Sequence, residues 1–187
     1  MDGHYVPNFT LGPDFCRKVA AHSPIPLDIH LMIENPDDFV PSFARFPGAV
    51  VSIHPETTYH PIRTIDLIKS LGARAGIAID PALALASVIE LLPHVSFACV
   101  MTVNPGYACQ KLVPNSIAKI RALSVLVAER CWNIEIKVDG NVSWENIPKM
   151  VDAGAEVLVA GTSSLYEPGA DLRGNIRRLH RLLGRGG

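Results

Sequence analysis

The sequence predicts one α/β domain with a parallel sheet, and three observations support this class. Six short apolar runs alternate along the chain with longer runs that carry apolar residues at helical spacing. The strand-like runs are nearly continuous apolar stretches, as parallel strands covered on both faces require. They recur at roughly 20 to 35 residues, the length of one strand–helix unit, without a linker or a composition break. We therefore expect a single domain over residues 1–187.

Each element follows from its local pattern. The expected strands are residues 27–33, 50–54, 73–80, 97–103, 134–139 and 156–161. The expected crossover helices are residues 36–46, 61–72, 82–92, 115–130 and 143–154, and residues 171–187 form a final helix with its arginines on the solvated face. Gly72 and Gly154 follow two of these helices and suit a left-handed C-terminal cap.

Repeated strand–helix units leave two architectures, an open doubly wound sheet or a closed barrel. Polar residues stand where the expected strands stop: His30, His54, Asp80, Asn104, Asp139 and Thr162. In a barrel the carboxyl ends of all strands meet in one ring, so such residues converge on one substrate. A doubly wound sheet focuses its ligand at one switch point and does not need polar residues after every strand. The pattern therefore favours a TIM (β/α)8 barrel.

Composition limits the partners and the compartment. The 187 residues are 48% hydrophobic and 19% charged, the formal net charge is −1, and no run of Lys and Arg is present. This excludes an electrostatic footprint for nucleic acid or an anionic membrane and favours a small-molecule partner. Four scattered cysteines without a C-x-x-C pair, no signal-peptide pattern and no apolar run of spanning length predict a cytoplasmic protein.

Five motifs in register resemble those of the ribulose-phosphate 3-epimerase family. They are MDGHYVPN at the start, LDIHLMI around His30, VMTVNPGYACQ, KVDGN around Asp139, and VAGTS after the last strand. The resemblance covers essentially the whole chain. Three details, HPET, MTV before Pro-Gly and GTSSLY, are closer to the D-allulose-6-phosphate 3-epimerase branch. The resemblance implies a barrel isomerase that epimerises a phosphorylated ketopentose or ketohexose at C3, in a family that commonly forms homo-oligomers.

The resemblance also implies the chemistry and two of its residues. A divalent metal, Zn, Fe, Mn or Co, polarises the C2 oxygen of the substrate, because the enediolate formed on removal of the C3 proton needs a cation as it develops. Inversion needs a carboxyl group on each face of C3. By motif match, His30 is a metal ligand that also contacts substrate, and Asp139 is a metal ligand and one of the two acid/base groups.

The remaining expected site residues bind substrate and its phosphate. Backbone amides of glycine-rich loops and a helix N-terminus after the last strands are the usual anion site of such barrels. The expected residues are Gly106, Tyr107, Ala108 and Cys109, then Gly140 and Asn141, and then Gly161, Thr162 and Ser163. Where the family has P-G-F-G-G-Q, this chain has Ala108 and Cys109, and a position there that needs positive φ would be strained. Asn141 replaces a family glycine and tolerates left-handed backbone better than most residues.

In the family, a strand–helix–strand segment with a further metal-ligating His and the second catalytic Asp precedes the MDG motif. We therefore expect a barrel that lacks its first βαβ unit in this chain, with weakened metal binding and impaired turnover. Two alternatives remain open. A non-catalytic sugar-phosphate-binding barrel would keep the phosphate loops without turnover. Another phosphate-binding barrel lyase, such as a decarboxylase or an aldolase-like synthase, is disfavoured because the D-x-K-x-x-D signature is absent.

Overall fold

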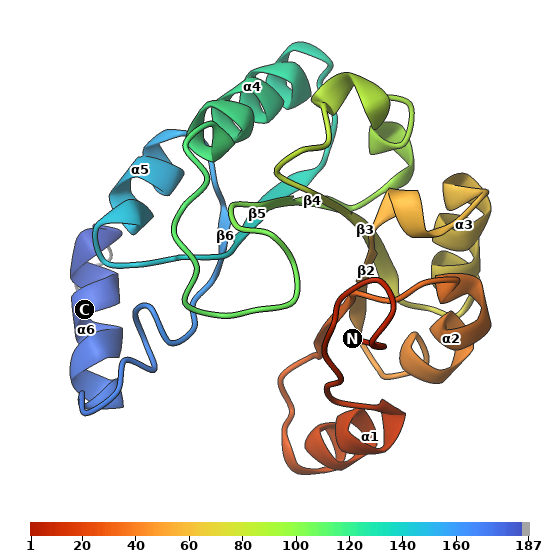
Figure 1. Cartoon of the computed structure of the whole chain (residues 1–187), viewed down its shortest axis with the longest axis horizontal. Helices are drawn as coiled ribbons and strands as arrows, with labels where there is room; N and C mark the ends of the chain where they lie inside the picture. Colours follow the sequence, from red (N-terminus) through yellow and green to blue (C-terminus); the bar gives the residue numbers. More distant parts are fainter. Residues whose placement is uncertain (185–187) are drawn as a thin grey trace. The chain divides into compact units, whose positions relative to one another are not determined.

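A computed structural model describes residues 1–184 (Figure 1). Its strands are β1 (Asp28–Leu31), β2 (Val50–Ile53), β3 (Arg74–Ile79), β4 (Phe97–Met101), β5 (Glu135–Asp139) and β6 (Val157–Val159). Its α-helices are α1 (Pro13–His22), α2 (Pro36–Phe43), α3 (Pro61–Ser70), α4 (Ser116–Glu129), α5 (Asn146–Asp152) and α6 (Leu172–Leu182). All six strands predicted from the sequence are present, each within its expected range.

The strands are hydrogen-bonded to one another in chain order, β1-β2-β3-β4-β5-β6. The pairs β1 with β2, β2 with β3, and β5 with β6 are parallel. In this register His30 stands opposite Ser52, and Ser52 stands opposite Gly76. Successive parallel strands joined by helical crossovers are the repeat of a TIM-barrel-like α/β fold, as the sequence predicted.

The chain packs as two compact units, each described here by itself. The first holds residues 1–79 and 83–99, and the second holds residues 80–82 and the described residues from Val100 onward. In the second unit, the Nζ atom of Lys119 on α4 donates hydrogen bonds to the carbonyl oxygens of Asp80 and Pro81, at 2.8 and 2.7 Å. A single domain over residues 1–187 stays a prediction, and residues 185–187 lie outside the described residues.

In the first unit, helices α2 and α3 lie beside strands β2 and β3 (Figure 1). Val51, Ile53 and Ile77 are fully buried, and nearly every position of β3 is buried. The ring of Phe97 passes over Gly76 so closely that an added Cβ would lie 2.2 Å from it. Gly76 is therefore required by the packing of the core.

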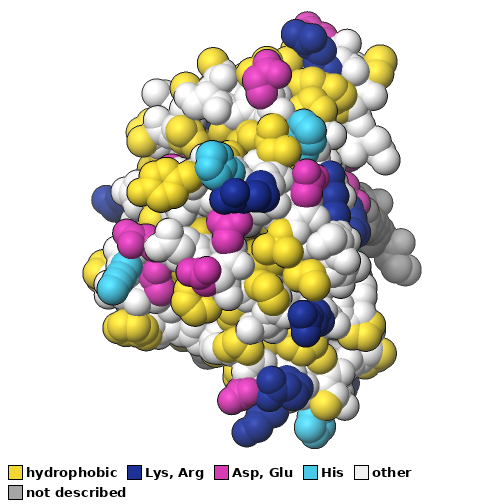
Figure 2. Space-filling view, turned by 90° about the vertical axis from the view of Figure 1, so that its right-hand side faces the viewer, with side chains coloured by type: hydrophobic (Ala, Val, Ile, Leu, Met, Phe, Trp, Pro, Cys, Tyr) yellow, Lys and Arg dark blue, Asp and Glu magenta, His cyan; other side chains and the backbone are white. Residues whose placement is uncertain are grey.

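In the second unit, α4 and α5 supply the apolar layer against β5. Ile120 and Leu123 of α4 are fully buried, as are Ile147 and Met150 of α5, whereas Val125 of α4 is 51% exposed. The helix thus buries one stripe and exposes the other, as apolar residues spaced three or four apart require. On the molecular face drawn in Figure 2, side chains of both charges are interspersed, in keeping with the formal net charge of −1.

One predicted helix is wrong. Residues 82–92 form no α-helix but contain the 3-10 helix η2 (Leu85–Ser87), and a second one, η3 (Leu92–His94), begins at their end. Pro93 lacks a backbone N–H and disfavours helical backbone before it, and β-branched residues precede it. The apolar residues of this segment nevertheless contribute to the core, since Val88, Leu91 and Leu92 are buried.

Other local expectations agree with the structure or extend it. Gly72 and Gly154 adopt φ values of +91° and +107°, as left-handed caps should. Helix α1, for which no prediction was made, starts with Pro13 in its first turn. The arginines of α6 are exposed as expected. Among the described helices, none is long and apolar enough to cross a membrane.

Candidate active site

The first unit carries a pair of contacting histidines, a half-buried one near the end of β1 and a fully buried one just after β2. His30 lies on β1, and His54 directly follows β2 and has no exposed surface. Their Nε2 atoms are 2.8 Å apart. The two rings are inclined by only 21° and their centroids are 5.0 Å apart, which is the arrangement of two imidazoles that meet edge to edge through one hydrogen bond.

The other edge of His54 faces two oxygen atoms. Its Nδ1 atom lies 2.9 Å from the Tyr5 hydroxyl and 3.5 Å from a carboxylate oxygen of Glu56. The Tyr5 hydroxyl donates to the same carboxylate at 2.8 Å. Burial raises the pKa of Glu56, but hydrogen bonds from His54 and Tyr5 outweigh burial and hold this pKa below its ordinary value. The cluster therefore ends on a carboxylate that is ionised at neutral pH.

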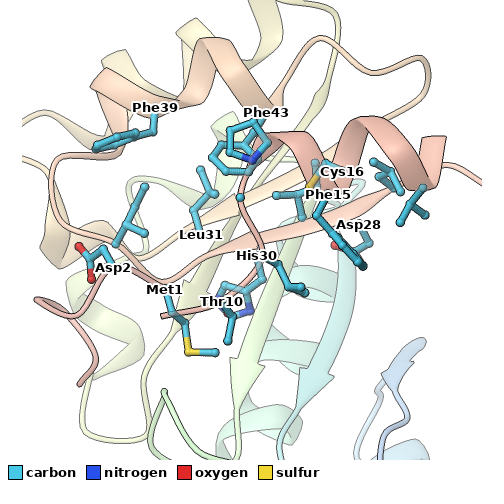
Figure 3. Close-up of a pocket in the computed structure, with 17 residues that line it drawn as sticks. Met1, Asp2, Thr10, Phe15, Cys16, Asp28, His30, Leu31, Phe39 and Phe43 are labelled. Carbon is cyan, nitrogen blue, oxygen red and sulfur yellow. The ribbon is translucent and has the colours of Figure 1, made fainter. Parts of the chain in front are cut away.

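A pocket of about 340 Å³ adjoins His30 in the same unit (Figure 3). The N-terminal segment contributes Met1 and Thr10, helix α1 contributes Phe15, and helix α2 contributes Phe39. The lining is mainly apolar, which does not match a sugar phosphate with its hydroxyl groups and charge. We therefore place the candidate site at the strand ends rather than inside this pocket.

The second unit carries Asp139 at the carboxyl end of β5, half-buried. Its carbonyl oxygen accepts a hydrogen bond from the Thr102 amide at 2.8 Å, which anchors the strand end to the residue after β4. The next residue, Gly140, has φ +106°, and an added Cβ would lie 2.5 Å from Val103. Asn141 follows with φ +41°, so this residue adopts the left-handed backbone conformation that asparagine was expected to tolerate.

The predicted loops after β4 and β5 are tied together. Asn141 donates from Nδ2 to the carbonyl oxygen of Gln110 at 2.6 Å, and Gln110 donates in turn to the carbonyls of Asn104 and Tyr107 at 2.6 and 2.9 Å. Within this loop Gly106 is buried, whereas Tyr107, Ala108 and Cys109 are exposed. Cys109 has φ +63°, so the strained geometry expected where a family glycine is replaced occurs at that residue.

The predicted residues Gly161, Thr162 and Ser163 follow β6 and run into a turn rather than into a helix. The Gly161 carbonyl accepts hydrogen bonds from the amides of Ser164 and Tyr166, both at 3.1 Å. The next helix, α6, begins only at Leu172, and the side chain of Asp171 caps its amides. The expected contribution of a helix N-terminus directly after the last strand is therefore wrong, because the chain closes a turn there first.

The residues present fit a divalent metal by their chemistry. The imidazole of His30 and the carboxylate of Asp139 are ligand types that Zn, Fe, Mn and Co accept. Metal-binding histidines normally hold their second ring nitrogen by a hydrogen bond, and His30 makes such a bond through Nε2. His54 and Glu56 also offer ligand atoms within 4.8 Å of one another.

Sequence reasoning missed two residues of this site and left a third undecided. Tyr5 and Glu56 were not singled out, and His54 was noted only as a polar residue at a strand end. Tyr5 lies 49 positions before His54 and 51 positions before Glu56, so no local sequence pattern joins them. The available signal was the His-Pro-Glu-Thr segment, which places an imidazole and a carboxylate two residues apart just after a strand.

Sequence comparison identifies relatives over most of the chain. The model of the Ribulose-phosphate 3 epimerase family matches residues 1–165. The chain is 38% identical over 183 residues to ribulose-phosphate 3-epimerase of Aquifex aeolicus, which covers 98% of this chain and 82% of that protein. It is also 38% identical over 164 residues to the enzyme of that name from Bacillus subtilis, covering 87% of this chain and 76% of the relative.

Solved structures support the fold alone. A mutant tryptophan synthase alpha-subunit from Pyrococcus furiosus matches with a TM-score of 0.64 at 14% identity, covering 95% of this chain and 75% of that one. A structure titled Native KDPGal matches with a TM-score of 0.57 at 16% identity, covering 92% and 76%. The family match over residues 1–165 and the relatives at 38% identity show that the chain belongs to the ribulose-phosphate 3-epimerase family.

Proposed function

We propose that this chain is a sugar-phosphate 3-epimerase that inverts C3 of ribulose 5-phosphate. The observation that carries the proposal is the family match over residues 1–165, with curated relatives named ribulose-phosphate 3-epimerase at 38% identity. These names favour the pentose substrate over allulose 6-phosphate, which the HPET and GTSSLY segments had suggested. The activity belongs to the isomerases that act on carbohydrate phosphates.

In this proposal Asp139 exchanges the C3 proton. A proton next to a carbonyl is weakly acidic, so a base must stand within hydrogen-bond reach of it in the bound complex. Asp139 is half-buried at a strand end, and its backbone is held by the hydrogen bond from the Thr102 amide. Gly140 and Asn141 turn the chain sharply away from the strand directly after it. A carboxylate on such an anchored strand end keeps one position while substrate binds and leaves.

His30 and Asp139 would each contribute a ligand atom to a divalent metal. When bound, such an ion supplies positive charge for the oxygen at C2 of the enediolate. His30 would supply an imidazole nitrogen, and its ring is fixed by the hydrogen bond to His54. These ligand types suit Zn, Fe, Mn and Co alike, so the preferred metal is to be identified by measuring the affinity of the chain for each of the four ions.

The phosphate would be bound by the loops after β4 and β6. Residues Gly106 to Cys109 form a loop whose shape is fixed by Gln110, and this loop offers backbone amides close to the β5 end. Gly161 offers an unobstructed backbone, because an added Cβ would meet nothing within 4 Å.

All four cysteines are free thiols, which supports a reducing, cytoplasmic location.

The test is solvent deuterium incorporation at C3. The purified chain is incubated in D₂O with ribulose 5-phosphate or allulose 6-phosphate and a series of divalent metals, and the products are followed by NMR. We expect exchange and epimer formation with ribulose 5-phosphate, and a loss of about 100-fold or more in Asp139→Asn. Asp152→Asn, an exposed aspartate at the end of α5, is the matched control and should retain the rate.

The outcomes separate the possibilities. No exchange with either substrate in a folded protein would overturn the proposal, and so would an unchanged rate in Asp139→Asn. Exchange that is faster with allulose 6-phosphate would keep the reaction and correct the substrate.

A further inference from the structure

The turn that follows β6 is held by one side chain of helix α6. Asn175 donates from Nδ2 to the carbonyl oxygens of Ser164 and Leu165, at 3.2 and 3.0 Å. Asn175 is only 8% exposed, and its backbone amide donates to the carbonyl oxygen of Asp171 at 2.9 Å. A buried amide that makes two hydrogen bonds to one turn ties this turn to the helix.

Helix α6 is itself fixed at this end. The side chain of Asp171 accepts the first amides of the helix, at 3.1 and 2.9 Å. One turn after Asn175, the guanidinium carbon of Arg178 lies 4.3 Å from the ring centroid of Trp144, in the segment between β5 and α5. The helix therefore presents Asn175 to the turn from a fixed position.

The held carbonyls decide where the amides of the turn point. The carbonyl of Gly161 points into the turn, where two later backbone amides donate to it at 3.1 Å. In a trans peptide the C=O and N–H groups point in opposite directions, so the amide of Thr162 points out of the turn. The carbonyl of Ser164 points at Asn175, and the amide of Leu165 consequently points away from α6.

Several donors of the turn have no acceptor in the protein. Within the part of the chain that the structure describes, the amides of Thr162 and Ser163 make no hydrogen bond. The hydroxyl of Ser164 is buried and also has no partner there. Thr162 is exposed and Ser163 is half-buried, so a ligand can reach both amides. Successive backbone amides without acceptors are a common binding place for anions.

The turn lies beside the proposed base. Strands β5 and β6 are parallel, and Asp139 is paired with Val159, the last residue of β6. Gly161 follows two residues later. Neighbouring strands are about 4.8 Å apart, so the carbon chain of a sugar phosphate that is bound at the turn can extend to Asp139.

We infer that Asn175 is a positioning residue for the phosphate of the substrate. It holds two carbonyls of the turn against α6 and thereby keeps the amides of Thr162 and Ser163 directed at the phosphate. The identity of the ligand rests on the proposed function, but the hold on the turn does not. Because Asn175 does not touch the substrate, its loss should raise KM and leave kcat nearly unchanged.

The first experiment uses the unchanged chain. The ¹⁵N-labelled protein is titrated with ribulose 5-phosphate, with inorganic phosphate and with unphosphorylated ribulose, and the backbone amides are followed by NMR. We expect the amide signals of Thr162 and Ser163 to shift with both phosphate compounds and to stay in place with ribulose. Amides that do not respond to either phosphate compound would overturn the inference.

This titration separates the inference from the proposed function. Amide shifts with inorganic phosphate, in a protein that shows no exchange at C3, would retain the anion-binding turn while the proposed function fails. Exchange at C3 without any shift at Thr162 and Ser163 would retain the function and remove the role of the turn.

Variants of Asn175 test the positioning role. Asn175→Leu has a similar size but no donor, and Asn175→Gln keeps the amide on a longer side chain. The dissociation constant for ribulose 5-phosphate should rise roughly 10- to 100-fold in Asn175→Leu, and Asn175→Gln should recover part of the loss. Binding of unphosphorylated ribulose should stay the same in both. If Asn175→Leu does not fold, Asn175→Ala takes its place.

Two controls separate positioning from general stability. Leu123→Ala on α4 removes a buried side chain and lowers stability without removing a hydrogen bond from the turn, so its affinity for ribulose 5-phosphate should be unchanged. Asn133→Leu changes an exposed asparagine of the same unit and should also bind normally. Equal weakening in Leu123→Ala and Asn175→Leu would show an effect of stability alone and overturn the inference. Unchanged affinity in a folded Asn175→Leu would do the same.

Discussion

Replacing Gly140 by alanine should destabilise the protein for two separable reasons. The residue has φ +106°, a backbone conformation that costs a residue with a side chain about 1–3 kcal/mol. The new Cβ would also lie 2.5 Å from the Cγ2 atom and 2.9 Å from the backbone nitrogen of Val103, and such overpacking costs about 1–3 kcal/mol. The free energy of unfolding should therefore fall by about 2–6 kcal/mol.

Two other glycines isolate the two effects. Gly72 has φ +91°, but an added Cβ meets nothing within 4 Å, so Gly72→Ala should carry the backbone cost alone, about 1–3 kcal/mol. Gly161 has neither a positive φ nor a neighbour within 4 Å, so Gly161→Ala should change stability by less than about 0.5 kcal/mol. The predicted order of destabilisation is Gly140, then Gly72, then Gly161.

Thermal unfolding followed by circular dichroism measures this order. A change of 1 kcal/mol shifts Tm by about 2–4 °C in a protein of this size, so we expect losses of roughly 2–12 °C for Gly72→Ala and roughly 4–24 °C for Gly140→Ala. If Gly140→Ala melted at the same temperature as Gly72→Ala, the close approach of Val103 would contribute nothing and the argument from packing would fail.

Further predictions concern a helix cap, the core and acid stability. Asp171→Ala removes the side chain that accepts two amides of α6 and should cost about 0.5–2 kcal/mol in urea unfolding, whereas Asp171→Asn should cost far less. Leu123→Ala should cost about 2–5 kcal/mol because its side chain is fully buried, and Val125→Ala on the exposed side of the same helix should cost little. Burial raises the pKa of Asp2, but hydrogen bonds from three backbone amides outweigh it and lower this pKa. Its stabilisation should be complete above the ordinary Asp range and lost as the pH falls through the lowered pKa, so the stability difference from Asp2→Asn should shrink in acid.

The extent of prediction differs from element to element for physical reasons. Strands β1 to β6 were found because a buried parallel strand is a short apolar run whatever its neighbours are. Residues 82–92 fit a helix by their apolar spacing, and Val88, Leu91 and Leu92 are indeed buried, but the segment forms only short 3-10 helices and turns. The strained Cys109 was foreseen from the replacement of a glycine in a known loop, since glycine is the residue that tolerates positive φ.

Local patterns were enough to predict the order of the six strands and of helices α2 to α6, the parallel class, the family motifs and the positions of His30 and Asp139 near strand ends, because these depend on residues that are close in the chain. What each of these residues contacts became visible only in the folded chain. It placed Tyr5 and Glu56 around His54, and it joined Asn141 to Gln110. Such pairs form when separate strands are brought side by side, so their protons, distances and burial depend on packing between distant segments that no local pattern records.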